Sequence, residues 1–117
     1  MNCKHLNEQF YRNRELVGTK GHCICEDCVF YAKHIVKNTE LVEWLDKRGL
    51  DPRKADEVWC YNEEGGFKFY AVDFFEVYAD QNETQNFENT TISIFFNSYA
   101  EKGKLSYACS MEIMLKT

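Results

Sequence analysis

The stretch KLSYACSMEIMLK, residues 104–116, carries the clearest structural pattern in this chain of 117 residues. Its apolar side chains recur at every second position and so share one face of an extended chain, whereas serines, Glu112 and Lys116 occupy the other face. The apolar positions are Leu105, Tyr107, Cys109, Met111, Ile113 and Leu115. We therefore expect a long strand that turns one face, Cys109 included, toward a hydrophobic core.

Three further segments are expected to pair in the same sheet. TISIFFNSY, residues 91–99, is rich in β-branched and aromatic residues, and the connection AEKGK with Gly103 predicts a turn into the last strand. Upstream, EVWCY at residues 57–61 and FKFYAVDFFEVYA at residues 67–79 flank the turn sequence NEEGG, which predicts a second hairpin. The polar segment between the hairpins, residues 80–90, is interpreted as an exposed loop.

Helical patterns occupy the first half of the chain. From Cys25 onward, apolar residues recur at spacings of three and four, which predicts a helix that ends near residue 37. A second helix is predicted for ELVEWLDKR, residues 40–48, with Asn38 or Thr39 as its cap and Gly49 as the left-handed residue that ends it. Residues 8–16 are compatible with a further short helix. The first helix is expected to present Cys28, Val29, Ala32, Ile35 and Val36 on one face.

The order of these elements predicts the fold class. Helices that precede strands are typical of α+β proteins, because alternating βαβ units would interleave them. We expect a single domain over residues 1–117, with a mainly helical and cysteine-rich part in 1–56 and an antiparallel sheet in 57–117. The sheet should contain about four strands, arranged as two hairpins and covered by two N-terminal helices. A hydrophobic fraction of 44% is sufficient for one core.

Charge and hydropathy disfavour two classes of partner. The net charge of −5 repels phosphate backbones, so binding of nucleic acid is not expected. The sequence contains neither a run of about 18 apolar residues nor an apolar segment behind a charged N-terminus, so it predicts no membrane span and no signal peptide. We therefore expect a cytoplasmic protein whose six cysteines are reduced.

The segment HCICEDCVFY, residues 22–31, concentrates three of the six cysteines. Four thiolates can form a tetrahedral zinc site, so the chain is expected to bind either no cofactor or one Zn²⁺. The C-x2-C spacing at a helix start would also suit a redox pair, although the strand and proline of a thioredoxin-like site are missing. Ordinary packed thiols are the third interpretation. The candidate metal ligands are Cys3, Cys23, Cys25 and Cys28, with His5 or His22 as substitutes.

No segment carries a catalytic signature, so we expect a small non-catalytic module that binds another protein or regulates one. Aromatic residues on the predicted strands outnumber what one sheet face can bury, and the surplus should form a partner site or a homodimer interface unless the N-terminal segment covers it. A zinc-binding module is the alternative function, and a thiol redox protein is the third. The aromatic residues in question are Phe67, Phe69, Tyr70, Phe74, Phe75, Phe95 and Phe96.

Overall fold

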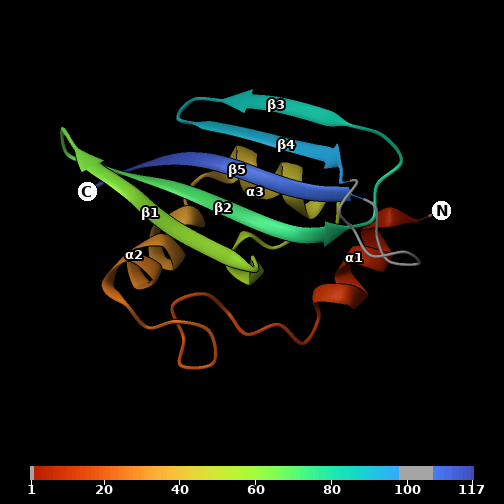
Figure 1. Ribbon diagram of the computed structural model, residues 1–117, viewed down its shortest axis with the longest axis horizontal. Helices are drawn as coiled ribbons and strands as arrows, with labels where there is room; N and C mark the ends of the chain where they lie inside the picture. Colours follow the sequence, from red (N-terminus) through yellow and green to blue (C-terminus); the bar gives the residue numbers. More distant parts are fainter. Residues whose placement is uncertain (1, 98–106) are drawn as a thin grey trace.

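The computed structural model describes residues 2–97 and 107–117 and shows an α+β fold (Figure 1). Helices occupy the N-terminal half of the described chain and strands the C-terminal half, as the sequence predicts. The helices are α1 (Cys3–Tyr11), α2 (Glu26–Ile35), α3 (Thr39–Asp46) and the short 3-10 helix η1 (Pro52–Lys54). The strands are β1 (Glu57–Glu64), β2 (Phe67–Val77), β3 (Glu83–Phe87), β4 (Thr90–Phe96) and β5 (Tyr107–Lys116).

The five strands form one antiparallel sheet in the order β1-β2-β5-β4-β3. Strand β5 lies at its centre, where it pairs with β2 on one side and β4 on the other. The alternation in its sequence is confirmed, because its buried side chains include Cys109, Met111, Ile113 and Leu115. The predicted turn at Gly103 and the predicted strand residue Leu105 lie outside the described residues.

The expectation of four strands is wrong, because the segment interpreted as a loop contains β3. This strand pairs with β4 along its whole length, and Asn89 takes the left-handed conformation (φ 70°) in the turn between them. β3 is an edge strand with mostly exposed, polar side chains, which is a common way to protect a sheet edge from further pairing. With no buried face, its sequence has no apolar alternation from which a strand could be predicted.

The expectation of two helices is also wrong, because α1 precedes them and begins earlier than the segment 8–16. Its contact with the rest of the fold is made by two buried side chains, Tyr11, whose ring lies in the hydrophobic core, and the polar Asn7. The amide nitrogen of Asn7 donates to the carbonyl oxygens of Arg48 (2.8 Å) and Tyr78 (3.0 Å), and its amide oxygen accepts from the backbone N–H of Tyr78 (2.8 Å). One of the two buried positions of this helix is polar, so an apolar pattern alone did not locate its start.

Helix α3 matches its prediction closely. Asn38 caps it by accepting a hydrogen bond from the backbone N–H of Leu41 (3.3 Å), and Leu41 and Leu45 are fully buried. Gly49 has φ +76° and ends the helical segment as expected.

Helix α2 is present where predicted, but its buried face is rotated relative to the predicted stripe. Val29 and Val36 are exposed, and Tyr31 is fully buried in their place. The hydroxyl of Tyr31 donates to the carbonyl oxygen of Pro52 (2.7 Å), so that the ring can be buried without leaving its polar group unpaired. The core face of α2 consists of Cys28, Tyr31 and Ile35.

The helices cover one face of the sheet and leave the other open. Figure 1 looks onto the open face, with α3 behind the sheet. The described part of the N-terminal segment does not cover this face, on which Trp59, Tyr61, Phe75 and Phe95 remain exposed. Within the described ranges, no helix is both long enough and apolar enough to cross a membrane.

Candidate metal centre

The cysteine-rich segment is folded by the start of α2. Cys25 is the N-cap of this helix, in an extended conformation (φ −64°, ψ 159°), and its Sγ accepts a hydrogen bond from the backbone N–H of Cys28 (3.4 Å). A cap residue and the third helical residue lie in the same turn. The C-x2-C spacing therefore brings the two thiols to the same side of the helix start.

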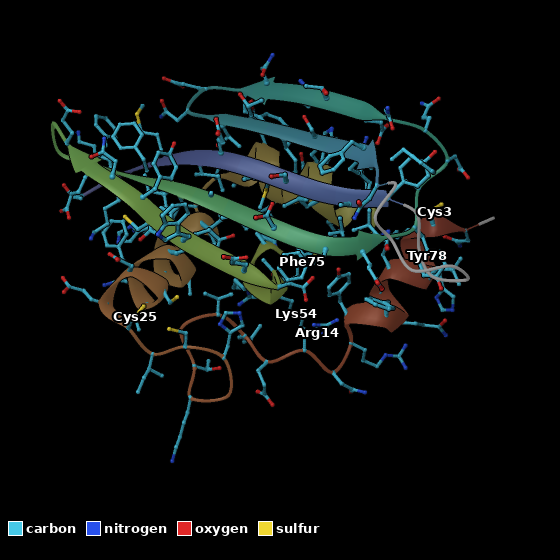
Figure 2. All side chains as sticks on the ribbon, in the orientation of Figure 1. Cys3, Arg14, Cys25, Lys54, Phe75 and Tyr78 are labelled. Atoms are coloured by element: carbon cyan, nitrogen blue, oxygen red, sulfur yellow. The ribbon has the colours of Figure 1, made fainter. Side chains whose placement is uncertain are left out.

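Cys23 joins this pair from the preceding loop. The Sγ atoms of Cys23, Cys25 and Cys28 all lie within 4.8 Å of one another. Cys28 is buried, Cys23 is half-buried and Cys25, at the start of α2 (Figure 2), is exposed. We name these three residues the thiol cluster. Its inner side is set in the core and its outer side is open to solvent.

Cys3 does not belong to the thiol cluster, although the sequence predicts it as the fourth ligand. It lies on α1, at the opposite end of the molecule from Cys25 (Figure 2), and its thiol donates to the Oδ2 atom of Asp80 (3.7 Å). Burial and the carboxylate of Asp80 raise the pKa of Cys3. His5 lies on the same helix, so neither residue is placed to complete the cluster.

His22, the other predicted substitute, precedes Cys23 directly but is engaged elsewhere. Its Nε2 atom lies 3.2 Å from the carbonyl oxygen of Ala55. The structure therefore unites three of the four predicted cysteines, and within the described chain no other group of three or more potential ligands converges in this way.

The three thiols of the cluster influence one another's protonation. A hydrogen bond from the backbone N–H of Cys25, together with hydrogen bonds from the neighbouring thiols, lowers the pKa of Cys23. Burial raises the pKa of Cys28, and its contacts with the other two thiols raise it further. Three thiolates in such proximity repel one another, and a bound cation would remove this repulsion.

The first turn of α2 is fastened to the sheet beside the cluster. The carboxylate of Asp27 pairs with the ammonium group of Lys68 on β2 (2.9 Å), and its backbone carbonyl accepts from the hydroxyl of Tyr70 (2.7 Å). Lys68 also lies 3.4 Å from a carboxylate oxygen of Glu63. The hydrogen bond to Asp27 raises the pKa of Lys68. The negative charge of Asp27 is thus paired within the chain and does not stand alone beside the thiolates.

The remaining cysteines are placed as packing residues. Cys109 is buried at the centre of the sheet, and burial raises its pKa to about 12. The thiol of Cys60 on β1 donates to the carbonyl oxygen of Asn62 (3.4 Å). Neither sulfur takes part in the thiol cluster.

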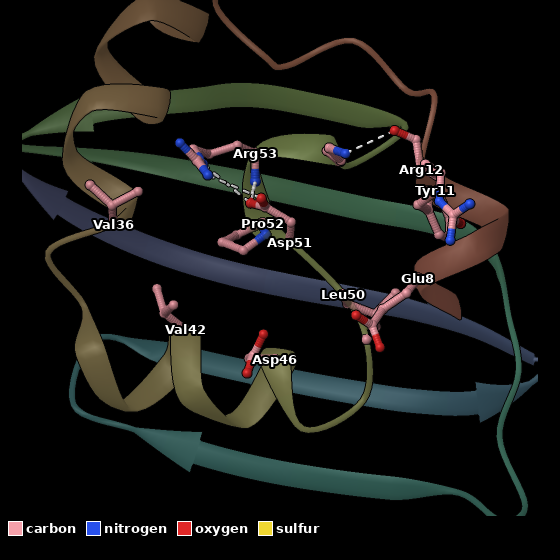
Figure 3. A pocket seen from close by; sticks show the side chains of 12 residues that line it. Glu8, Tyr11, Arg12, Val36, Val42, Asp46, Leu50, Asp51, Pro52 and Arg53 are labelled. Carbon is pink, nitrogen blue, oxygen red and sulfur yellow. Dashed lines mark hydrogen bonds and ion pairs between the residues drawn. The ribbon is translucent and has the colours of Figure 1, made fainter. Parts of the chain in front are cut away.

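A separate hollow of about 460 Å³ lies on the helical side, between α1, α3 and η1 (Figure 3). Its rim carries charges of both signs. Glu8 and Asp46 are acidic, Arg53 is paired with Asp51 (3.1 Å), and Lys54 donates to a backbone carbonyl just after α1 (3.0 Å). This mixed and partly self-paired rim does not select a ligand of one charge, and we assign no site to it.

Comparison with known proteins gives no family assignment. No protein-family model matches the chain, and no curated protein or solved structure matches it. The case for the thiol cluster therefore depends on its geometry and chemistry.

Proposed function

We propose that the protein binds one thiophilic metal ion, Zn²⁺ in the first instance, through the thiolates of Cys23, Cys25 and Cys28. The observation that carries this proposal is the convergence of three sulfur atoms within 4.8 Å. In a tetrahedral zinc site, Zn–S bonds of about 2.3 Å place the sulfurs about 3.8 Å apart. Small side-chain rotations are enough to close the cluster around an ion.

The third sulfur distinguishes this proposal from a redox pair, which needs only two cysteines. Soft thiolate ligands favour Zn²⁺ or Cu⁺ over harder cations such as Mg²⁺ or Ca²⁺. The fourth position of a zinc ion would face solvent at the exposed Cys25 and would take a water molecule. Reduced thiols are required, in keeping with the cytoplasmic location that the sequence predicts.

The ion would stabilise the start of α2, because one ligand precedes this helix and another lies within it. Cys23 belongs to the long connection between α1 and α2, whereas Cys28 is fixed in the core by α2. A metal that joins them would tie this connection to the helix. Because the unfolded chain cannot hold the site together, the free energy of metal binding would add to the free energy of unfolding.

Zinc titration of the reduced protein, in competition with a chromophoric chelator, tests this function. We expect one zinc per chain and at least about 100-fold weaker binding in Cys25→Ser. Cys25 is exposed, so this variant should still fold. Cys3→Ser is the matched control, because it removes a thiol that lies outside the cluster, and it should bind zinc like the wild type. Equal losses in both variants, or a wild type without affinity for zinc, would refute the proposal.

A further inference from the structure

The open face of the sheet contains a hollow of about 300 Å³ that the thiol cluster does not explain. The rings of Tyr61 on β1 and Phe69 on β2 line one side of it. Met114 and Glu112 on β5 and Thr91 on β4 line its floor, and residues of the turn between β3 and β4 also border it. The strand register accounts for this arrangement, because Phe69 pairs with Met114 and Glu112 pairs with Thr91, so that these side chains share the open face.

A β-bulge completes the aromatic side of the hollow. The pairing of β1 with β2 shifts between Cys60 and Asn62, and Tyr61 is the extra residue. Its ring lies 6.3 Å from the ring of Phe69 and 6.1 Å from the ring of Trp59, measured between centroids. Trp59 is 62% exposed. The three rings form a continuous aromatic surface that begins at the sheet edge and ends in the hollow.

The charges on this face are mainly acidic, with Lys116 at the far end of β5 as the exception, and the carboxylates near the hollow form no ion pair within the described chain. Glu57 pairs in register with Asp73, and Glu112 lies on the neighbouring strand β5, two residues from the partner of Asp73. None of the ion pairs among the described residues involves any of the three. Lys68, although it is on β2, points to the helical side and pairs there with Asp27.

We infer that this face docks a basic segment of another protein, with an arginine side chain of that segment seated in the hollow. A guanidinium group is planar and can stack on the rings of Tyr61 and Phe69 while it donates to the carboxylate of Glu112. Charge complementarity favours a basic partner. A second copy of this chain would bring the same carboxylates face to face, and nucleic acid would be repelled by them.

Fluorescence anisotropy with a labelled nona-arginine peptide, at about 0.1 M salt, tests this docking surface. Glu112→Gln removes one charge in the hollow, and Glu88→Gln removes one charge at the exposed turn between β3 and β4, where Glu88 does not line the hollow although the residues on either side of it do. We expect Glu112→Gln to weaken binding about 2- to 5-fold more than Glu88→Gln does. Tyr61→Ala should weaken it by a similar factor through the loss of stacking, and nona-lysine should bind less tightly than nona-arginine.

Four outcomes would overturn the inference. Equal effects of Glu112→Gln and Glu88→Gln would mean that the peptide responds only to net charge. Equal affinities for nona-arginine and nona-lysine would exclude stacking on the rings. A dimer in sedimentation that Tyr61→Ala dissociates would identify a second copy as the occupant, and tighter binding of an oligonucleotide than of nona-arginine would identify nucleic acid.

Discussion

Replacing Asn7 by alanine should loosen α1 from the rest of the fold. The Asn7 side chain is 1% exposed and makes three hydrogen bonds, two as a donor to backbone carbonyls and one as an acceptor from a backbone N–H. Its partners are Arg48, just after α3, and Tyr78, at the end of β2. One side chain thus joins the first helix to two distant parts of the chain.

The size of the effect follows from the number of bonds. Each hydrogen bond contributes about 0.5–1.5 kcal/mol net, and backbone groups left without a partner in a buried site add to the loss. We expect Asn7→Ala to lower the free energy of unfolding by about 2–4 kcal/mol. Asn7→Asp keeps the volume but replaces two donors by acceptors that face two carbonyl oxygens. At pH 7 it should cost at least as much as Asn7→Ala.

Urea denaturation of the reduced, metal-free protein, followed by tryptophan fluorescence, measures these differences without a contribution from bound metal. Asn13→Ala is the control, because Asn13 is exposed in the turn after α1, and its effect should stay within about 0.5 kcal/mol. The reasoning is refuted if Asn7→Ala is as stable as the control. It is refuted equally if Asn7→Asp unfolds at the same urea concentration as the wild type.

Three further predictions concern other parts of the fold. Gly49→Ala should lower the free energy of unfolding, measured by thermal denaturation, by more than about 2 kcal/mol. The reason is that φ at Gly49 is +76° and an added Cβ atom would collide with the carbonyl oxygen of Lys4. A smaller loss would contradict the close packing of α1 against this residue. A hydrogen bond from Arg48 lowers the pKa of Glu83 in the folded protein below the value of about 4.5 that it has in the unfolded chain. The ion pair therefore stabilises the folded state fully above about pH 4.5, and this stabilisation is lost as the pH falls through the pKa of Glu83 in the folded protein. The stability difference between wild type and Glu83→Gln, up to about 1 kcal/mol at pH 7, should therefore shrink as the pH is lowered below about 4.5, and a difference independent of pH would disprove this. Cys109, with its pKa raised to about 12, should resist a thiol reagent at pH 8 until urea unfolds the protein, and rapid labelling of the folded state would show that it is not buried.

Sequence patterns predicted the elements that bury an apolar face. β5 is central and packs one side against the helices, so its alternation was a reliable guide. β3 and α1 were harder to predict because polar side chains occupy all of β3's exposed face and one of the two buried positions of α1. β3 is a polar edge strand, and Asn7 fastens α1 by hydrogen bonds. In α2, the hydrogen-bonded hydroxyl of Tyr31 allowed a residue outside the predicted stripe to occupy the core.

The thiol cluster could be predicted in part for similar reasons. Cys25 and Cys28 lie in one helical turn, and Cys23 is close enough in sequence to fold back onto them, so local spacing was informative. The position of Cys3 depends on where α1 docks, which is set by contacts between residues far apart in the chain. The hollow on the open face depends on the bulge at Tyr61 and on strand order, which the sequence pattern did not specify.

X-ray absorption at the zinc edge of the loaded, reduced protein tests the central claim most directly, because it counts the sulfur atoms bound to the metal. The thiol cluster predicts three sulfurs at about 2.3 Å and one oxygen, from water, at about 2.0 Å. The same spectrum should be found for Cys3→Ser, whereas Cys25→Ser should show at most two sulfurs. Four sulfurs in the wild type, or the signature of a bound histidine, would contradict the three-thiolate site.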